Sequence, residues 1–332
     1  MRPKIVFLVM SAQQSGELIG QLVDALAPHP VVVHHDFSKR GSFNLDRKRA
    51  HLVPDPLETG WGTWSFCEAI LHGMQHCCDN FDYDYLQLLS PTCLPIRPLA
   101  EFEAHVSDTR VDVHADLIAI LEDRDAWMTY AWRAFLPHRS LRQRIANRMV
   151  AQYFGEHPRR AQLASLVVMA SAEDGSGLAQ LRRRGALAVT ECLTSTLAPG
   201  SAYSAGFRPF VGSTWFGARR AVVEHLLLRS REERLREFFA SLTNVDEHFF
   251  PTLLGNSSFA LGSSNHAISK FDSFGHPVPI DAAAFSVIRE SQKFFARKFP
   301  ADPQALVRKL ALARARAPTP SGACEAVGSP GS

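Results

Sequence analysis

The 332-residue sequence predicts an α/β protein with a doubly wound, mixed sheet flanked by helices. Residues 5–10 form an unbroken apolar run, which is typical of a parallel strand that is covered on both faces. A helical pattern over residues 15–26 and a second apolar strand at residues 31–33 follow directly. This strand–helix–strand order at the start of the chain indicates a parallel sheet with crossover helices. The composition, 46% hydrophobic and 21% charged, agrees with an ordinary globular protein.

The same alternation of helical and strand patterns continues along the chain. Further helical patterns cover residues 65–78, 99–106, 221–228, 232–242 and 303–315, and further strands cover residues 85–89 and 211–216. Between residues 122 and 200 the periodicity loosens, and aromatic residues and arginines dominate. We therefore predict one domain over residues 1–316, with residues 122–200 as a helical and aromatic insertion or lobe over the sheet. Residues 317–332, rich in Pro, Gly, Ser and Ala, are expected to form a disordered tail.

Charge and cysteine usage exclude some classes of protein. The net charge of +3 is too small to indicate nucleic-acid binding. The six cysteines form no CxxC pair, which favours free thiols in a reducing compartment. No stretch reaches the ~18 apolar residues that a membrane span needs, and no cleavable signal is visible. We expect a cytoplasmic protein.

One basic stretch predicts a contact with a membrane surface. Over residues 139–148, arginines lie among apolar residues that recur every four positions, at Leu141, Ile145 and Met149. This pattern is typical of a helix that binds peripherally to an anionic membrane. The alternative is a helix packed on the sheet with a solvated basic face.

Two segments in the C-terminal half carry candidate chemistry. Asp246 and Glu247 precede an apolar aromatic run, and Arg297 and Lys298 lie between phenylalanines about fifty residues later. A carboxylate can take a proton from a hydroxyl, and cations can neutralise phosphate oxygens in place of a divalent ion. The acids also fit the first turn of a helix, and the cations also fit a plain surface pair.

An ordered set of motifs extends through the chain. The set comprises Trp61-Gly62-Thr63-Trp64-Ser65, Leu89-Ser90, Pro95-Ile96-Arg97, Gly212-Ser213-Thr214-Trp215-Phe216, Asp246-Glu247-His248-Phe249-Phe250, Asn256-Ser257 and Phe295-Ala296-Arg297-Lys298-Phe299. In this order the motifs resemble the core-2/I-branching β-1,6-N-acetylglucosaminyltransferases and peptide O-xylosyltransferases, glycosyltransferase family 14, in a bacterial-type member. The resemblance covers roughly residues 4–312.

The resemblance implies a GT-A fold and an inverting, metal-independent transfer of a sugar from a UDP-sugar to a hydroxyl. The expected sugar is N-acetylglucosamine or xylose, and the expected acceptor is a glycan, a lipid-linked glycan or a protein. By the same resemblance Glu247 is the base, and Lys298 with Arg297 binds the donor diphosphate. Asp36, at the end of the second strand, and Ser90 are expected at the nucleotide; capping the turn at Ser38 is the alternative for Asp36.

Other residues complete the expected pocket. Its donor and acceptor walls are expected to include Trp61, Gly212, Ser213, Trp215 and Asp246. Aromatic residues of the lobe, namely Trp127, Tyr130 and Trp132, are expected to stack on acceptor sugars, with plain core packing as the alternative.

The sequence offers no clear metal site for the donor. Asp82-Tyr83-Asp84 resembles the manganese motif of many sugar transferases, but it precedes the third strand instead of following it. We therefore expect no metal and no cofactor beyond the UDP-sugar co-substrate. Two rival functions are a non-catalytic sugar-nucleotide or glycan binder, which needs no base, and a glycoside hydrolase, which needs two carboxylates around one bond.

Overall fold

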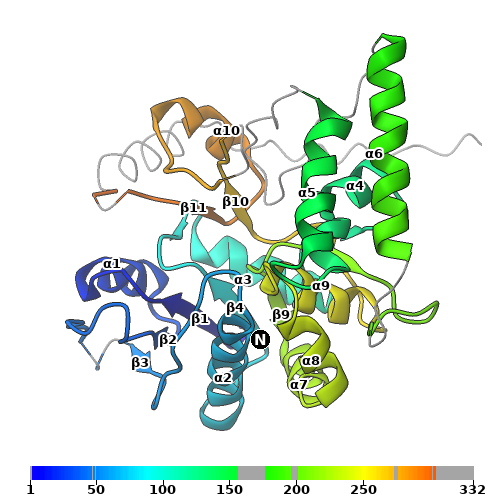
Figure 1. Ribbon diagram of the computed structural model, residues 1–332. Coiled ribbons are helices and arrows are strands. Elements are labelled where there is room, and N and C mark those ends of the chain that lie inside the picture. The colour runs from blue at the N-terminus through cyan, green and yellow to red at the C-terminus, as the bar shows by residue number, and fades with distance from the viewer. Residues whose placement is uncertain are drawn as a thin grey trace, which may run out of the picture.

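A six-stranded mixed sheet forms the centre of the protein (Figure 1). The computed structural model describes residues 2–46, 48, 50–155, 176–195, 201–272, 276–300 and 302–303. The strands, in the order β3-β2-β1-β4-β9-β6, are β3 (His51–Leu52), β2 (Val31–His35), β1 (Ile5–Ser11), β4 (Tyr85–Leu89), β9 (Gly217–Arg219) and β6 (Val113–His114). β3, β2, β1 and β4 run parallel, whereas β9 is antiparallel to both of its neighbours. The predicted α/β class with a mixed, doubly wound sheet is confirmed.

Alternating side chains of β1 enter two separate cores, one on each face of the sheet. Val6, Leu8 and Met10 pack with α2 (Trp64–Asn80), α7 (Arg220–Arg229), α8 (Glu233–Ala240) and α9 (Asp246–Gly255). Ile5, Phe7 and Val9 pack on the other face with α1 (Gly16–Leu26), α3 (Leu99–Asp108) and Phe295. Each fully buried apolar side chain contributes roughly 1.5–3 kcal/mol, so burial on both faces explains the unbroken apolar run at residues 5–10.

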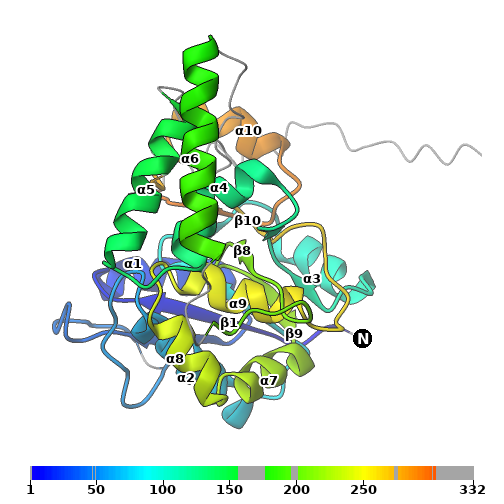
Figure 2. The same ribbon diagram turned by 45° about the vertical axis from the view of Figure 1, so that its right-hand side comes forward.

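The described part of the 122–200 insertion is helical. It comprises α4 (Arg124–Ala134), α5 (Leu141–Phe154) and α6 (Gly177–Ser195). These helices share a small core of their own, formed by Met128, Val150, Tyr153, Phe154 and Ala186. α5 and α6 lie side by side and project from the body of the protein (Figures 1 and 2). The lobe therefore lies above the sheet, and α4 packs against both the main core and the core of the lobe.

The single strand that we expected over residues 211–216 is wrong. The chain forms β8 (Phe210–Gly212), which pairs with β7 (Leu117–Ala119), then turns and enters the central sheet as β9. Gly212 lies so close to Asp116 that a Cβ atom there would be 1.9 Å from the Asp116 carbonyl oxygen. This close approach leaves no room for a side chain at position 212, and residues 213–216 form the turn between the two sheets.

A third sheet brings the C-terminal motif to the end of β4. In it β10 (Ala267–Ser269) pairs in parallel with β11 (Phe295–Arg297), and β11 pairs with β5 (Leu94–Pro95), which follows β4 closely. η1 (Ala282–Ala284) and α10 (Phe285–Glu290) connect β10 to β11. The predicted helix over residues 303–315 begins at the last described residue, and the rest of it and the tail over 317–332 lie outside the described residues.

Two further properties concern the whole described chain. Among the residues that the structure describes, no helix combines the length and the apolar character that crossing a membrane requires. Among the described residues, no disulfide joins any of Cys67, Cys77, Cys78, Cys93 and Cys192.

Candidate active site

A pocket of about 610 Å³ opens at the carboxyl ends of β1 and β4. Ligands of open parallel sheets bind at this edge, and the volume is within the usual range for small-molecule sites. Its lining combines the ends of both strands, α4, the turn after β8, the start of α9 and the end of β11; the residues with side chains of chemical interest are Trp61, Ser90, Tyr130, Arg133, Ser213, Thr214, Trp215, Asn244, Asp246, Glu247, Arg297 and Lys298.

Asp246 and Glu247 enter the pocket from the first turn of α9. Asn244 precedes them with a positive φ of 51°, a conformation that asparagine tolerates better than most residues. The Thr214 hydroxyl donates a 2.5 Å hydrogen bond to Oδ2 of Asp246. Burial and the neighbouring Glu247 nevertheless raise the pKa of Asp246 to about 6. A pKa of about 6 leaves most Asp246 carboxyl groups ionised at neutral pH, so this part of the pocket carries negative charge.

Glu247 faces the lobe across the pocket. Its Oε2 atom accepts hydrogen bonds from Arg133 Nη1 at 3.3 Å and from Asn244 Nδ2 at 3.4 Å. Its side chain is 40% exposed, so solvent and a substrate hydroxyl can reach the carboxylate. These contacts orient the carboxylate without enclosing it.

Arg133 is a pocket residue that sequence reasoning missed. It lies on α4, with its guanidinium carbon 4.9 Å from the centre of the Trp132 ring. Its Nε atom is buried and has no hydrogen-bond partner among the described residues. The only signal in the sequence was one arginine within the aromatic run of the lobe, and that pattern does not say which way the side chain points.

Arg297 and Lys298 line the pocket at the end of β11. The Arg297 guanidinium carbon is 5.0 Å from the centre of the Trp215 ring, and its buried Nε atom has no hydrogen-bond partner among the described residues. Burial lowers the pKa of Arg297, whereas Cys93, Glu247 and Asp246 act to raise it. Burial and then Arg297 lower the pKa of Lys298. Two half-buried cations side by side form a site for an anion of more than one charge.

The structure brings most of the other predicted residues to this pocket. Ser90, whose hydroxyl is 3.0 Å from that of Thr92, lies at the exit of β4. Gly212, Ser213 and Trp215 follow β8, and Tyr130 lines the lobe side. Trp61 is 88% exposed at the rim. The loop that carries it is fixed at Gly62, where a Cβ atom would be 3.0 Å from the Asn244 side chain.

Asp36 does not line the pocket. Its two carboxylate oxygens accept four hydrogen bonds, from the main-chain nitrogen and hydroxyl of Ser38 and of Thr59. Burial acts to raise the pKa of Asp36, but these hydrogen bonds outweigh it and lower the pKa to about 2. The turn-capping alternative is confirmed, because all four acceptor positions of the carboxylate are occupied within the protein. A nucleotide contact by Asp36 stays a prediction.

Trp127 and Trp132 do not line the pocket either. Both pack between the main core and the core of the lobe, and the Trp132 ring nitrogen donates to the Thr129 carbonyl at 2.9 Å. Core packing, the alternative for these residues, explains their positions. Of the three predicted acceptor aromatics, only Tyr130 lies at the pocket.

The Asp82-Tyr83-Asp84 motif lies at the start of β4, at the opposite end of the strand from the pocket. Asp82 pairs with Lys4 at the surface, and Asp84 accepts a 2.8 Å hydrogen bond from the Lys4 main-chain nitrogen. These contacts explain both acids as parts of a solvated strand start. The acids that line the described pocket are Asp246 and Glu247.

Comparison with models of known protein families gives a match within the C-terminal half of the chain. Residues 167–279 match the family model of the Core-2/I-Branching enzymes, a range that includes β8, β9, the Thr214 turn and the acid pair of α9. A comparison with curated proteins found no match. Over residues 167–279, the chain is therefore similar to the Core-2/I-branching enzymes, which are glycosyltransferases.

Proposed function

We propose that this protein is an inverting, metal-independent glycosyltransferase that moves a sugar from a UDP-sugar to a hydroxyl. One observation carries the proposal: an acid pair, Asp246 and Glu247, and a cation pair, Arg297 and Lys298, line the same pocket at the carboxyl edge of the parallel strands. A binder needs no base beside its anion site. A hydrolase needs two carboxylates that flank a bond, whereas Asp246 and Glu247 are neighbours in one helical turn.

The reaction that we propose is a single in-line displacement. The Glu247 carboxylate takes the proton of the acceptor hydroxyl, and the acceptor oxygen attacks the anomeric carbon from the side opposite the diphosphate. The new glycosidic bond forms as the bond from the anomeric carbon to the phosphate oxygen breaks, so the configuration inverts. UDP leaves with the electron pair of that bond.

Arg297 and Lys298 stabilise the departing diphosphate. Their positive charges lie in a partly buried pocket, where opposite charges attract more strongly than in water. The Trp215 ring below the Arg297 guanidinium holds one of these cations in place. In this account the cation pair takes the part that a divalent ion has in many other transferases.

Arg133, Asn244 and Thr214 orient the acids. Arg133 and Asn244 both contact Oε2 of Glu247, and Thr214 holds Asp246. Holding the Glu247 carboxylate beside the acceptor hydroxyl contributes much of the rate enhancement in such a reaction. The exposed Trp61 and the lobe residue Tyr130 offer aromatic faces to an acceptor sugar.

The donor sugar that we propose is N-acetylglucosamine or xylose, and the acceptor a glycan, a lipid-linked glycan or a protein. The compartment that we propose is the reducing cytoplasm, which agrees with the absence of disulfides among the described cysteines. Peripheral contact with an anionic membrane would bring the enzyme to lipid-linked acceptors.

A UDP-release assay tests the proposed function. The purified chain is incubated with UDP-N-acetylglucosamine, UDP-xylose, UDP-galactose or UDP-glucose, each with and without a mixture of glycan acceptors. We expect UDP release from one donor, stimulated by acceptor. Donor binding without any release would instead indicate a binder, and sugar release from glycans without UDP would indicate a hydrolase.

A further inference from the structure

Three histidines from separate segments of the chain converge on one another. His105 lies on α3, His114 lies on β6 and His266 immediately precedes β10. One ring nitrogen of each lies within 4.8 Å of the others. None of the three lines the pocket described above. The cluster therefore needs an explanation of its own.

Gln87 fixes the protonation of His266. The Gln87 Nε2 group donates to the main-chain carbonyls of Leu88, at 3.1 Å, and Phe216, at 3.2 Å. Its Oε1 atom therefore faces Nδ1 of His266 at 2.9 Å. Because an amide oxygen can only accept, Nδ1 carries the proton and Nε2 of His266 carries a free lone pair. That Nε2 atom is buried, with no hydrogen-bond partner among the described residues.

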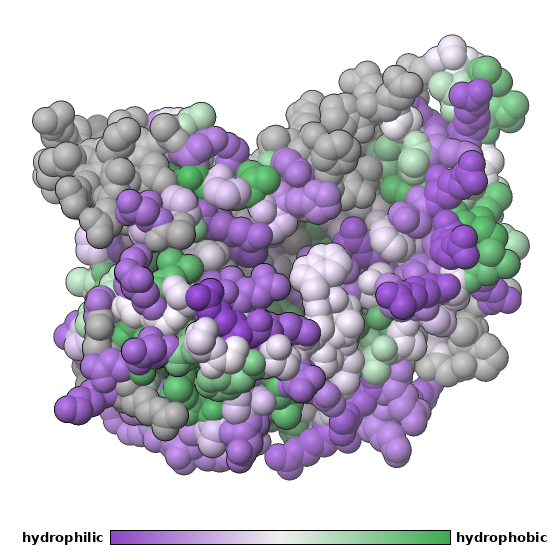
Figure 3. Space-filling model, turned by 60° about the vertical axis from the view of Figure 1, so that its left-hand side comes forward, coloured by the Kyte–Doolittle hydropathy of each residue, from purple (hydrophilic) through white to green (hydrophobic). Residues whose placement is uncertain are grey.

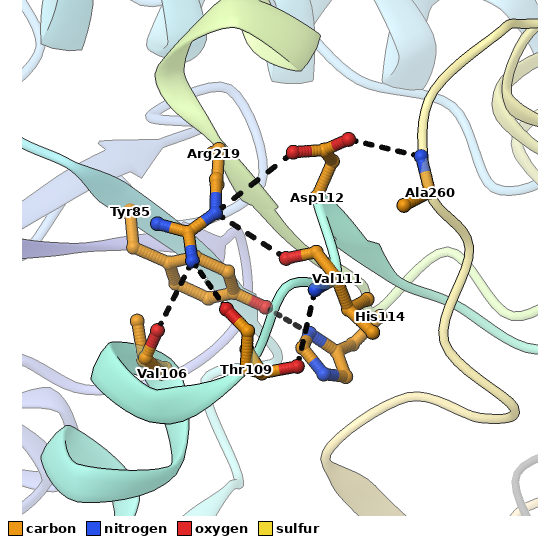
Figure 4. A network of polar contacts seen from close by, with 8 residues as sticks. All are labelled: Tyr85, Val106, Thr109, Val111, Asp112, His114, Arg219 and Ala260. Atoms are coloured by element: carbon orange, nitrogen blue, oxygen red, sulfur yellow. Dashed lines mark hydrogen bonds and ion pairs between the residues drawn. The ribbon is translucent and has the colours of Figure 1, made fainter.

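His114 and His105 have the separation of two ligands of one metal ion. The Nδ1 atom of His114 lies 2.9 Å from the Tyr85 hydroxyl, which holds the ring (Figure 4). Its Nε2 atom lies 3.3 Å from Nε2 of His105. Two nitrogens bound at the usual zinc distance with a tetrahedral angle between them are about 3.3–3.4 Å apart. Polar groups behind the two buried rings are the outer partners that ligand histidines use.

The cations near this cluster are already paired. Arg219 donates to the main-chain carbonyls of Val106, Thr109 and Val111 and faces Asp112 at 3.9 Å (Figure 4). Lys293 donates to the Asn265 carbonyl at 2.6 Å. These hydrogen bonds use the donor groups of both cations elsewhere, so the three imidazoles face one another.

We propose that His105, His114 and His266 bind one Zn²⁺ ion, with water as the fourth ligand. Imidazole nitrogens are preferred zinc ligands, and within the described parts of the chain the cluster consists of the three histidines. The ion would join α3, β6 and the segment before β10. Since β10 pairs with β11, which ends at Arg297, the zinc would stabilise the platform of the phosphate-binding cations without entering the sugar-transfer reaction.

Zinc analysis of the full chain tests this proposal. The protein is purified without metal-affinity steps, stripped with a chelator and titrated with Zn²⁺, and bound zinc is counted by mass spectrometry. We expect one zinc per chain, a higher melting temperature with zinc, and the visible absorption of tetrahedral cobalt when Co²⁺ replaces it. Tyr85→Phe, which removes only the outer hydroxyl, should weaken zinc binding about 10–100-fold.

Variants separate this site from other histidines. His266→Ala and His105→Ala should abolish stoichiometric binding, whereas His138→Ala, at an exposed histidine of the lobe, should leave it unchanged. If His266→Ala does not fold, His105→Ala decides, since solvent reaches His105. No zinc on the titrated wild-type chain would overturn the proposal, as would binding that survives in His105→Ala.

Discussion

Replacement of Thr214 by valine should move the acid limb of the pH–rate profile upward. The Thr214 hydroxyl donates a 2.5 Å hydrogen bond to Asp246, whose pKa is already raised to about 6 by burial and by Glu247. A hydrogen bond to a charged group contributes about 1.5–3 kcal/mol, and one pKa unit corresponds to about 1.4 kcal/mol. Because Asp246 keeps some contact with solvent, the lower end of this range applies. The acid limb should therefore rise by about one pH unit.

The assay is the pH dependence of kcat/KM for sugar transfer between pH 5 and 9. In the wild-type protein activity should fall below about pH 6, where Asp246 takes up a proton and the pocket loses negative charge beside the base Glu247. In Thr214→Val the fall should begin about one unit higher. Thr190→Val is a matched control, because Thr190 is an equally buried threonine whose hydroxyl binds a helical carbonyl in α6. An unmoved limb in Thr214→Val, or an equal shift in the control, would refute the role of this hydrogen bond.

The same pair makes a prediction about stability. The folded-state pKa of Asp246 lies above its ordinary value of 3.8. Its contribution to stability is therefore fully present below about pH 4 and is lost as the pH rises through about 6. Because Thr214 stabilises the ionised form, Thr214→Val should lower the melting temperature more at pH 8 than at pH 5. An equal loss at both pH values would contradict the assigned charge state.

Three further outcomes follow from the pocket and the lobe. Lys298→Met should weaken UDP binding about 10–100-fold in calorimetry while uridine binding stays unchanged; equal UDP affinity would remove Lys298 from the diphosphate site. Transfer measured within minutes of EDTA addition should persist, and loss of activity that Mn²⁺ restores would contradict the metal-free mechanism. The protein should co-sediment with anionic liposomes at low salt and be released by added salt. The reason is that Leu141 and Ile145 of the lobe are exposed among arginines, and apolar side chains gather on the outer edge of the projection (Figure 3). An absence of binding even at low salt would exclude this membrane contact.

The sequence predicted the fold where burial alone determines structure. The apolar run of β1 and the helical pattern of α1 are local, and both occur within one residue of the expected bounds. The break after Gly212 was missed, because β8 pairs with β7 whereas β9 pairs with β4 and β6, and all of these partners come from distant segments. Local patterns do not record such constraints.

The pocket residues show the same difference between what local patterns and what distant contacts determine. The acids of α9 and the cations at the end of β11 were identified from motifs, and the structure places both at one pocket. Arg133 was missed because its place depends on how α4 packs against the sheet. Asp36 was expected at the ligand because it ends a strand, but its neighbours Ser38 and Thr59 occupy its carboxylate. Sequence patterns supply the residue types, whereas tertiary contacts decide which of them face a ligand.

The most direct test of the central claim compares Glu247→Gln with the wild-type chain in two assays, UDP binding and acceptor-dependent UDP release. Glutamine keeps the shape of the side chain but cannot take the acceptor proton, so UDP affinity should be unchanged while release falls about 10²–10⁴-fold. Glu122→Gln, at an exposed glutamate paired with Arg208, is the control and should retain full activity. Near-normal release by Glu247→Gln would contradict the assignment of Glu247 as the base, and with it the proposed mechanism.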